Sequence, residues 1–74
     1  MAKGDISTYH EDGQWKNKVE GSSRAANVHD TKAEAQSKGR DMARDRHVEH
    51  TIRNMDGKIG EKNSYGNDPR NIKG

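Results

Sequence analysis

The chain has 74 residues, of which 26% are hydrophobic and 35% charged, and its formal net charge is only +2. This length allows one domain at most, and a composition without Leu or Phe approaches that of chains that stay disordered because they bury too little apolar surface. The absence of cysteine excludes disulfides, thiolate catalysis and cysteine zinc sites, and the small net charge is unlike the dense basic patch of a strong nucleic-acid binder.

The first predicted element is a β-hairpin around Asp12-Gly13. Asp-Gly favours a two-residue type I′ turn, because both central positions need a positive φ that Gly adopts freely and Asp tolerates. The register set by this turn pairs three sets of residues: Ile6 with Val19, Thr8 with Asn17, and His10 with Trp15. The apolar members of these pairs then share one face of the hairpin, and Tyr9 and Lys16 lie on the other.

A helix is predicted to begin at about Lys32, because Thr31 and Glu34 have the spacing of a capping box. One stripe of this helix carries mostly small or flexible side chains: Ala35, Gly39, Met42, Ala43 and the stem of Arg46. Small residues let a helix approach a sheet closely. Gly39 costs about 1 kcal/mol relative to alanine in a helix interior, so it is either a close-packing point or a weak point. The helix is expected to fray by about His47.

A second hairpin is predicted around Asp56-Gly57 from the same turn chemistry. The corresponding register pairs four sets of residues: Asn54 with Ile59, Ile52 with Glu61, His50 with Asn63, and Val48 with Tyr65. This register gathers the apolar residues of both strands, including Ile59, onto one face. The sequence at 66–69 then predicts a turn that ends the last strand, because Pro69 has no amide hydrogen to pair.

The order of these elements is hairpin, helix, hairpin, which predicts a small α+β domain of the ββαββ type. We expect one antiparallel sheet built from the two Asp-Gly hairpins, with the helix packed on one face. The domain is predicted to span residues 5–69, between a flexible N-terminus at 1–4 and a flexible C-terminal tail at 70–74. No apolar run is long enough for a membrane span or a signal-peptide core, which predicts a cytoplasmic protein.

Three segments of the chain together resemble one bacterial protein family. They are the run SRAANVHDTKAEA at 23–35, the Asp56-Gly57 hairpin, and SYGNDP at 64–69. The combination is similar to the family called domain of unknown function 2188, and the similarity extends from Ile6 to the C-terminus. This resemblance implies a stand-alone bacterial or phage-associated protein with a compact α+β fold, and it implies no particular activity, cofactor or substrate.

The four histidines do not predict a metal site or a catalytic centre. His47 and His50 are spaced as H-x-x-H, but such a pair converges on zinc only within a continuous helix, and here it spans the predicted helix-to-strand boundary. His29 and Asp30 could suggest a catalytic pair, but no nucleophile or enclosed pocket accompanies them, and Asp30 and Thr31 are explained by the helix start. We therefore expect a protein without catalytic residues, metal or cofactor.

A binding role follows from the small number of large apolar residues, because so thin a core is more plausible when another chain completes the sheet face or edge. We predict self-association or a protein partner, with no membrane and no small-molecule substrate. The residues assigned to this contact are expected outside the helix-covered face: Tyr9, Met55, Tyr65, Asn67 and Arg70.

The alternative function is weak nucleic-acid binding through basic side chains, with Tyr9 or Tyr65 available to stack on bases. The cations for this role lie on the predicted helix and in the loop before it: Arg24, Lys32, Lys38, Arg40 and Arg44. The interleaved acidic residues Glu34, Asp41 and Asp45 weaken the positive field of this helix face.

Overall fold

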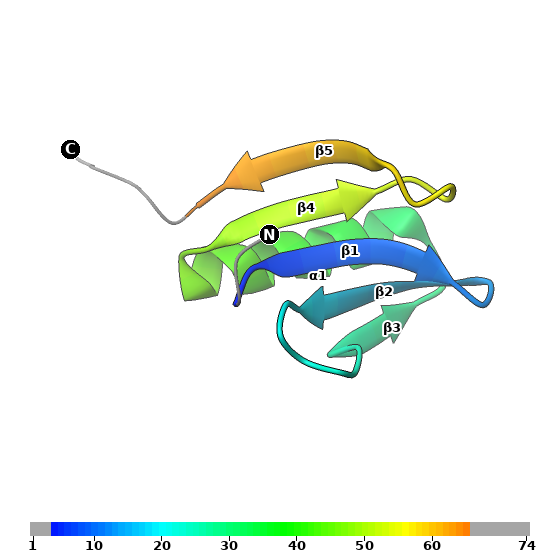
Figure 1. The fold of residues 1–74 in the computed structure, drawn as a ribbon, viewed down its shortest axis with the longest axis horizontal. Helices are drawn as coiled ribbons and strands as arrows, with labels where there is room; N and C mark the ends of the chain where they lie inside the picture. Colours follow the sequence, from blue (N-terminus) through cyan, green and yellow to red (C-terminus); the bar gives the residue numbers. More distant parts are fainter. Residues whose placement is uncertain (1–3, 66–74) are drawn as a thin grey trace.

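The computed structural model describes residues 4–65, which form a five-stranded mixed β-sheet with one α-helix packed on one face (Figure 1). The elements follow the chain in this order: β1 (Ile6–Glu11), β2 (Gln14–Val19), β3 (Asn27–His29), α1 (Lys32–Arg46), β4 (Glu49–Arg53) and β5 (Ile59–Ser64). The strand order in the sheet is β3-β2-β1-β4-β5. The predicted turn at 66–69 and the predicted tail at 70–74 lie outside the described residues, as do residues 1–3.

The predicted α+β class and the single helix on one face are confirmed, but the purely antiparallel ββαββ sheet is wrong. The difference is β3, a three-residue strand that pairs antiparallel with β2 and was not predicted. This strand reverses the direction of the chain before the helix. The return through α1 therefore brings β4 in parallel to β1, with Ile6 beside His50 and Thr8 beside Ile52. The other neighbouring strands pair antiparallel.

The first hairpin has the predicted turn and the predicted register. Asp12 and Gly13 have φ values of 55° and 78°, the positive values that a type I′ turn requires. The three predicted pairs are present: Ile6 with Val19, Thr8 with Asn17, and His10 with Trp15. The rings of His10 and Trp15 meet edge to face, with their centroids 5.0 Å apart. Local turn chemistry was therefore sufficient to place this hairpin.

The second hairpin has a different turn from the one predicted. Gly57 has a φ of 89°, whereas Asp56 is not among the described residues with positive φ, so this is no type I′ turn. The Gly57 N–H donates to the Asn54 carbonyl at 2.9 Å, and the Asn54 N–H donates to the Lys58 carbonyl at 2.8 Å. These bonds form a longer loop in which the glycine occupies the left-handed position at the end of the turn.

This longer loop changes the register at the start of β5. A shift at Ile52/Arg53 pairs Ile59 with Arg53 rather than with Asn54. Ile59 is consequently 53% exposed, and its predicted place among the core residues is wrong. The pairs nearer the other end of the hairpin are as predicted: Ile52 with Glu61 and His50 with Asn63. The Tyr65 N–H also donates to the Val48 carbonyl at 3.2 Å, so a backbone hydrogen bond joins the two residues of the predicted Val48–Tyr65 pair.

Helix α1 begins and ends where the sequence predicts. Thr31 has an extended backbone, and its hydroxyl accepts a hydrogen bond from the Glu34 N–H at 3.2 Å. At the other end, His47 adopts a left-handed conformation with a φ of 59°, and its N–H bonds to carbonyls of the last turn. The helix contacts the first four strands of the chain but not β5 among the described residues.

The buried stripe of α1 consists of small residues. Ala35, Gly39 and Ala43 are buried, as predicted, and Met42 is half-buried. Arg46 is exposed, so the predicted packing of its stem along the stripe is not confirmed. The helix can approach the sheet closely because none of its three buried residues is larger than alanine. The apolar core that results is small: Ile6, Trp15, Ala35, Ala43 and Ile52.

Beneath Gly39 the sheet carries a row of hydrogen-bonded polar side chains, which we name the polar ladder: His50 on β4, Thr8 on β1, Asn17 on β2 and Asn27 on β3. Thr8 Oγ1 lies 2.7 Å from His50 Nε2 and 2.5 Å from Asn17 Oδ1. Asn17 Nδ2 lies 2.8 Å from Asn27 Oδ1. Thr8, Asn17 and His50 are at most 1% exposed, so these bonds are made away from water.

Asn17 determines which atoms donate and which accept along the polar ladder. Its amide nitrogen donates to the Ala35 carbonyl and to Asn27 Oδ1, each at 2.8 Å, so its Oδ1 accepts from the Thr8 hydroxyl. The single Thr8 hydroxyl hydrogen is then used, and the Thr8 oxygen accepts from the His50 Nε2–H. Neutral His50 therefore holds its proton on Nε2. Its Nδ1 is buried without a hydrogen-bond partner among the described residues.

Helix α1 rests directly on the polar ladder at Gly39. A Cβ atom at this position would lie 2.6 Å from Asn17 Oδ1, 2.6 Å from His50 Nε2 and 2.7 Å from Thr8 Oγ1. These distances are shorter than real carbon contacts, so a side chain would force the helix away or disrupt the ladder. Gly39 is therefore the close-packing point that the sequence left as one of two alternatives.

We expect Gly39→Ala to lower the free energy of unfolding by about 1–3 kcal/mol, because overpacking at the ladder outweighs the gain of about 1 kcal/mol in helix propensity. Urea unfolding followed by Trp15 fluorescence and circular dichroism measures this change. Ser37→Ala, at an exposed position of the same helix, is the control and should alter stability by less than about 0.5 kcal/mol. A Gly39→Ala protein at least as stable as the unmodified protein would contradict the direct contact.

The burial of the His50 ring leads to a second prediction, which concerns how the stability of the protein depends on pH. Burial lowers the pKa of His50 from its ordinary value of 6.5; the Glu61 carboxylate acts against this lowering, and Arg40 adds to it. The unfolded chain therefore binds a proton at a higher pH than the folded chain. The stability that neutral His50 contributes is fully present above about pH 6.5 and is lost as the pH falls toward the folded-state pKa.

His50→Gln removes this titration and keeps a side-chain nitrogen that can donate to Thr8. We expect a flatter dependence of the unfolding free energy on pH in this variant, between about pH 7.5 and pH 5, than in the unmodified protein. Urea midpoints measured across this range compare the two. Equal slopes in both proteins would show that His50 does not titrate as described.

Candidate interaction surfaces

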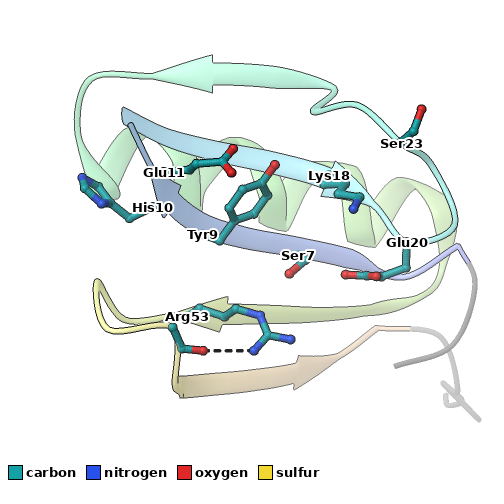
Figure 2. Close-up of a pocket in the computed structure, with 9 residues that line it drawn as sticks. Ser7, Tyr9, His10, Glu11, Lys18, Glu20, Ser23 and Arg53 are labelled. Carbon is teal, nitrogen blue, oxygen red and sulfur yellow. Dashed lines mark hydrogen bonds between the residues drawn. The ribbon is translucent and has the colours of Figure 1, made fainter. Parts of the chain in front are cut away.

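The sheet face opposite α1, which we name the open face, is covered by no other described element (Figure 1). Alternation along β1 directs Ser7 and Tyr9 to this face, because their neighbours Ile6 and Thr8 are buried under the helix. A hollow of about 490 Å³ lies on the open face, and Figure 2 shows its lining. The lining side chains include Ser7, Tyr9, Lys18, Glu20 and Arg53.

Salt bridges neutralise part of the open face. The described residues form two ion pairs: Lys16 Nζ with Glu11 Oε1 at 3.0 Å, and Lys62 Nζ with Glu49 Oε1 at 3.3 Å. The hydrogen bond to Glu11 raises the pKa of Lys16, so this ammonium stays charged. Neither Lys18 nor Arg53 forms an ion pair with a carboxylate of residues 4–65. Two cations of the hollow thus remain available to a ligand.

Tyr9 stands within the hollow and is half-buried. Burial raises the pKa of its hydroxyl, Glu11 adds to this rise, and Lys16 opposes it. The hydroxyl therefore stays protonated at neutral pH and can donate a hydrogen bond. In Figure 2 the Tyr9 ring rises from β1, with Lys18 on the β2 side and Arg53 on the β4 side.

The two edges of the sheet differ in length. β5 has six residues, of which five are exposed, whereas β3 at the opposite edge has three. The Tyr65 N–H points toward β4, where it bonds to Val48. By alternation, the N–H and C=O groups of Lys62 and Ser64 point away from the sheet. The β5 edge therefore presents backbone groups that a further strand can pair with.

Of the predicted partner-contact residues, the three that the structure describes belong to different parts of the fold. Tyr9 is on the open face, whereas Met55 is 70% exposed in the loop that leads into β5. Tyr65 is half-buried and follows the other end of β5. Asn67 and Arg70 lie outside the described residues. Sequence reasoning missed the exposed Ile59, because only the altered loop of the second hairpin moves this residue out of the core.

The predicted nucleic-acid residues lie mostly on the solvent side of α1. Lys38, Arg40 and Arg44 are exposed there, and Arg24 is exposed in the loop between β2 and β3. Lys32 is half-buried, with its ammonium 5.6 Å from the Trp15 ring centroid, in the range of a cation–π contact.

These helix cations and Tyr9 lie on opposite sides of the sheet, because α1 covers one face and Tyr9 belongs to the other. They therefore cannot contact the same short nucleic-acid segment. Two cations nearer to Tyr9, Lys18 and Arg53, were not among the predicted residues. The period-2 alternation of β2 could have identified Lys18 as a residue of the same face as Tyr9. The position of Arg53 next to Tyr9 depends on the parallel pairing of β4 with β1, which the sequence did not predict.

The histidines of the H-x-x-H pair do not converge. His47 is exposed at the end of α1, whereas His50 is buried in the polar ladder. His29 Nε2 lies 2.8 Å from Asn27 Oδ1, which extends the polar ladder toward the edge at β3. Among residues 4–65, no group of three or more metal-ligating side chains is placed to hold a metal ion. The helix of this described part lacks the length and apolar character needed to cross a membrane.

Among the described residues, these features define a small α+β domain with one helix-covered face, one open face and a long exposed edge at β5. Comparison with protein families identifies the family described as "Uncharacterized protein conserved in bacteria (DUF2188)", whose model matches residues 6–65. The match extends from the first residue of β1 to the residue after β5. The chain therefore belongs to this family, and the resemblance seen in the sequence is confirmed over residues 6–65, whereas its expected extension to the C-terminus is not part of the match. No curated protein and no solved structure matches the chain.

Proposed function

We propose that the protein is a non-enzymatic binding protein that self-associates by pairing its β5 edge with the β5 edge of a second copy. The observation that carries this proposal is the length and exposure of β5, which α1 does not reach. A long exposed edge strand is a template for pairing with another chain, and natural proteins usually shorten or cover such edges. The β3 edge is shortened in this way, but the β5 edge is not.

The charges on β5 select a register for this pairing. Antiparallel pairing centred on Glu61 would place Glu61 opposite Glu61 of the second copy, and pairing centred on Lys62 would place the two Lys62 residues opposite each other. Either register brings like charges into contact. Pairing centred on Asn63 avoids this, because it places Lys62 opposite Ser64 of the second copy. Lys62 and Ser64 are also the residues whose backbone groups point outward, so they can form the hydrogen-bonded pair.

This register gives one predicted contact residue a role. Tyr65 would lie opposite Glu61 of the second copy, at the end of the paired segment. Met55 precedes β5 by four residues and would lie beyond this segment. The proposed interface consists mainly of backbone hydrogen bonds, as in other cases of strand addition.

Replacing Lys62 by proline or by glutamine tests the backbone pairing at a single position. Lys62→Pro removes an outward N–H, which an edge strand tolerates, whereas Lys62→Gln keeps this N–H and removes the charge. We expect Lys62→Pro to weaken self-association at least about tenfold and Lys62→Gln to retain it. Size-exclusion chromatography with light scattering over a concentration series measures both.

Circular dichroism establishes that each variant is folded, and Ser64→Pro, at the other outward-facing position, is a second test of the same kind. A protein that is monomeric throughout the concentration series would contradict self-association. Equal behaviour of Lys62→Pro and Lys62→Gln would contradict backbone pairing at β5.

A further inference from the structure

The hollow on the open face contains ligand-binding groups that pairing at the β5 edge does not use. Its volume of about 490 Å³ is within the range of small-molecule sites, and its lining comes from three adjacent strands and from the loops that follow β2 and β4. Strand addition at β5 would extend the sheet sideways and leave this hollow accessible. The hollow can therefore carry a function independent of self-association.

Two cations flank the centre of this hollow. Lys18 of β2 lies opposite Ser7 of β1, and the parallel pairing of Thr8 with Ile52 places Arg53 next to Tyr9. Neither cation has a carboxylate partner among the described residues. Arg53 donates through Nη1 to the Gly57 carbonyl at 3.1 Å, which orients the guanidinium and leaves its other N–H groups for an anion (Figure 2).

The acidic groups of the hollow only partly offset these cations. Glu11 is held by Lys16, which lies outside the lining, so this carboxylate is already neutralised. Lys18 and Arg53 together carry two positive charges against one negative charge on Glu20, which leaves +1. The hollow therefore favours a ligand with a small anionic group, for which the Arg53 fork is suited.

Tyr9 adds a planar apolar surface beside this anion site. Its ring stands on the sheet and its protonated hydroxyl can donate, while the Ser7 hydroxyl lies deeper, at 3% residue exposure. A sheet that presents an aromatic ring flanked by cations is a recurring means of holding an unstacked base and its phosphate. Inorganic phosphate alone would use the cations and leave Tyr9 without a role.

We propose that the hollow on the open face binds a nucleotide unit, with the base against Tyr9 and the phosphate between Lys18 and Arg53. A free nucleotide and a nucleotide within a single strand share this chemistry. The site differs from the predicted nucleic-acid surface on α1, because it uses the opposite side of the molecule.

Titration of the full chain with a fluorescent oligouridine of about ten nucleotides and with uridine monophosphate tests this site, by anisotropy and by NMR shifts of the Ser7 and Tyr9 amides. One phosphate held between the two cations predicts a slope of log K against log salt of about −0.7 for the single strand. Lys18→Gln should weaken binding and make this slope smaller in magnitude, and Tyr9→Ile should weaken binding at least about fivefold. Arg46→Gln, at the exposed end of α1, is the matched control and should leave the affinity and the slope unchanged.

Similar affinity for the monophosphate and the oligonucleotide would identify a free nucleotide as the ligand, and binding of the oligonucleotide alone would identify a single strand. The absence of binding to both at low salt would overturn the proposal. Binding of inorganic phosphate as tight as that of the monophosphate, and unchanged in Tyr9→Ile, would overturn the role of the base. An effect of Arg46→Gln equal to that of Lys18→Gln would overturn the location. Circular dichroism of each variant separates these outcomes from unfolding.

Discussion

The contact between Gly39 and the polar ladder replaces the large apolar core that this chain cannot build. With no Leu or Phe, the helix gains little from apolar contacts and instead approaches until its backbone lies on hydrogen-bonded side chains. Burying polar groups costs free energy unless they are paired, and in the ladder Thr8 and Asn17 are paired on both sides. The ladder also links four strands, so a slip in any one of them would leave buried donors and acceptors unsatisfied.

The same constraint determines which surfaces remain free. Asn27 belongs to the ladder, and it requires the short strand β3, which reverses the chain and makes β4 parallel to β1. β5 then becomes the outer strand on the side that α1 does not reach. Because one helix covers one face, the opposite face stays open. The free edge and the hollow are thus consequences of how the core is built.

The parts of the fold that depend on local chemistry could be predicted from the sequence. The Asp12-Gly13 turn set the first hairpin, including the Thr8–Asn17 pair of the ladder, and Thr31 set the helix start. The same dipeptide at Asp56-Gly57 led to a wrong prediction, because Asp-Gly also suits a longer loop with glycine at its end. The predicted two-residue turn and the observed longer loop differ by one residue in the register that they give to the start of β5.

Non-local pairing could not be predicted in this way. β3 has three residues, too few for a period-2 pattern, and its partner is recognised only once β2 is placed. The link from Thr8 to His50 and the approach of Arg53 to Tyr9 both depend on the parallel pairing that β3 causes. Sequence reasoning therefore placed Tyr9 on the correct face of its hairpin but missed the cations that complete the candidate site.

The central claim is that neutral His50 donates from Nε2 into a polar ladder shielded from water. Long-range ¹⁵N NMR of the histidine rings, combined with hydrogen exchange of the Asn17 side-chain amide, measures this directly. We expect an unprotonated Nδ1, a protonated Nε2 and a slowly exchanging Asn17 amide at neutral pH. A proton on Nδ1, or an Asn17 amide that exchanges as fast as an exposed one, would contradict the ladder.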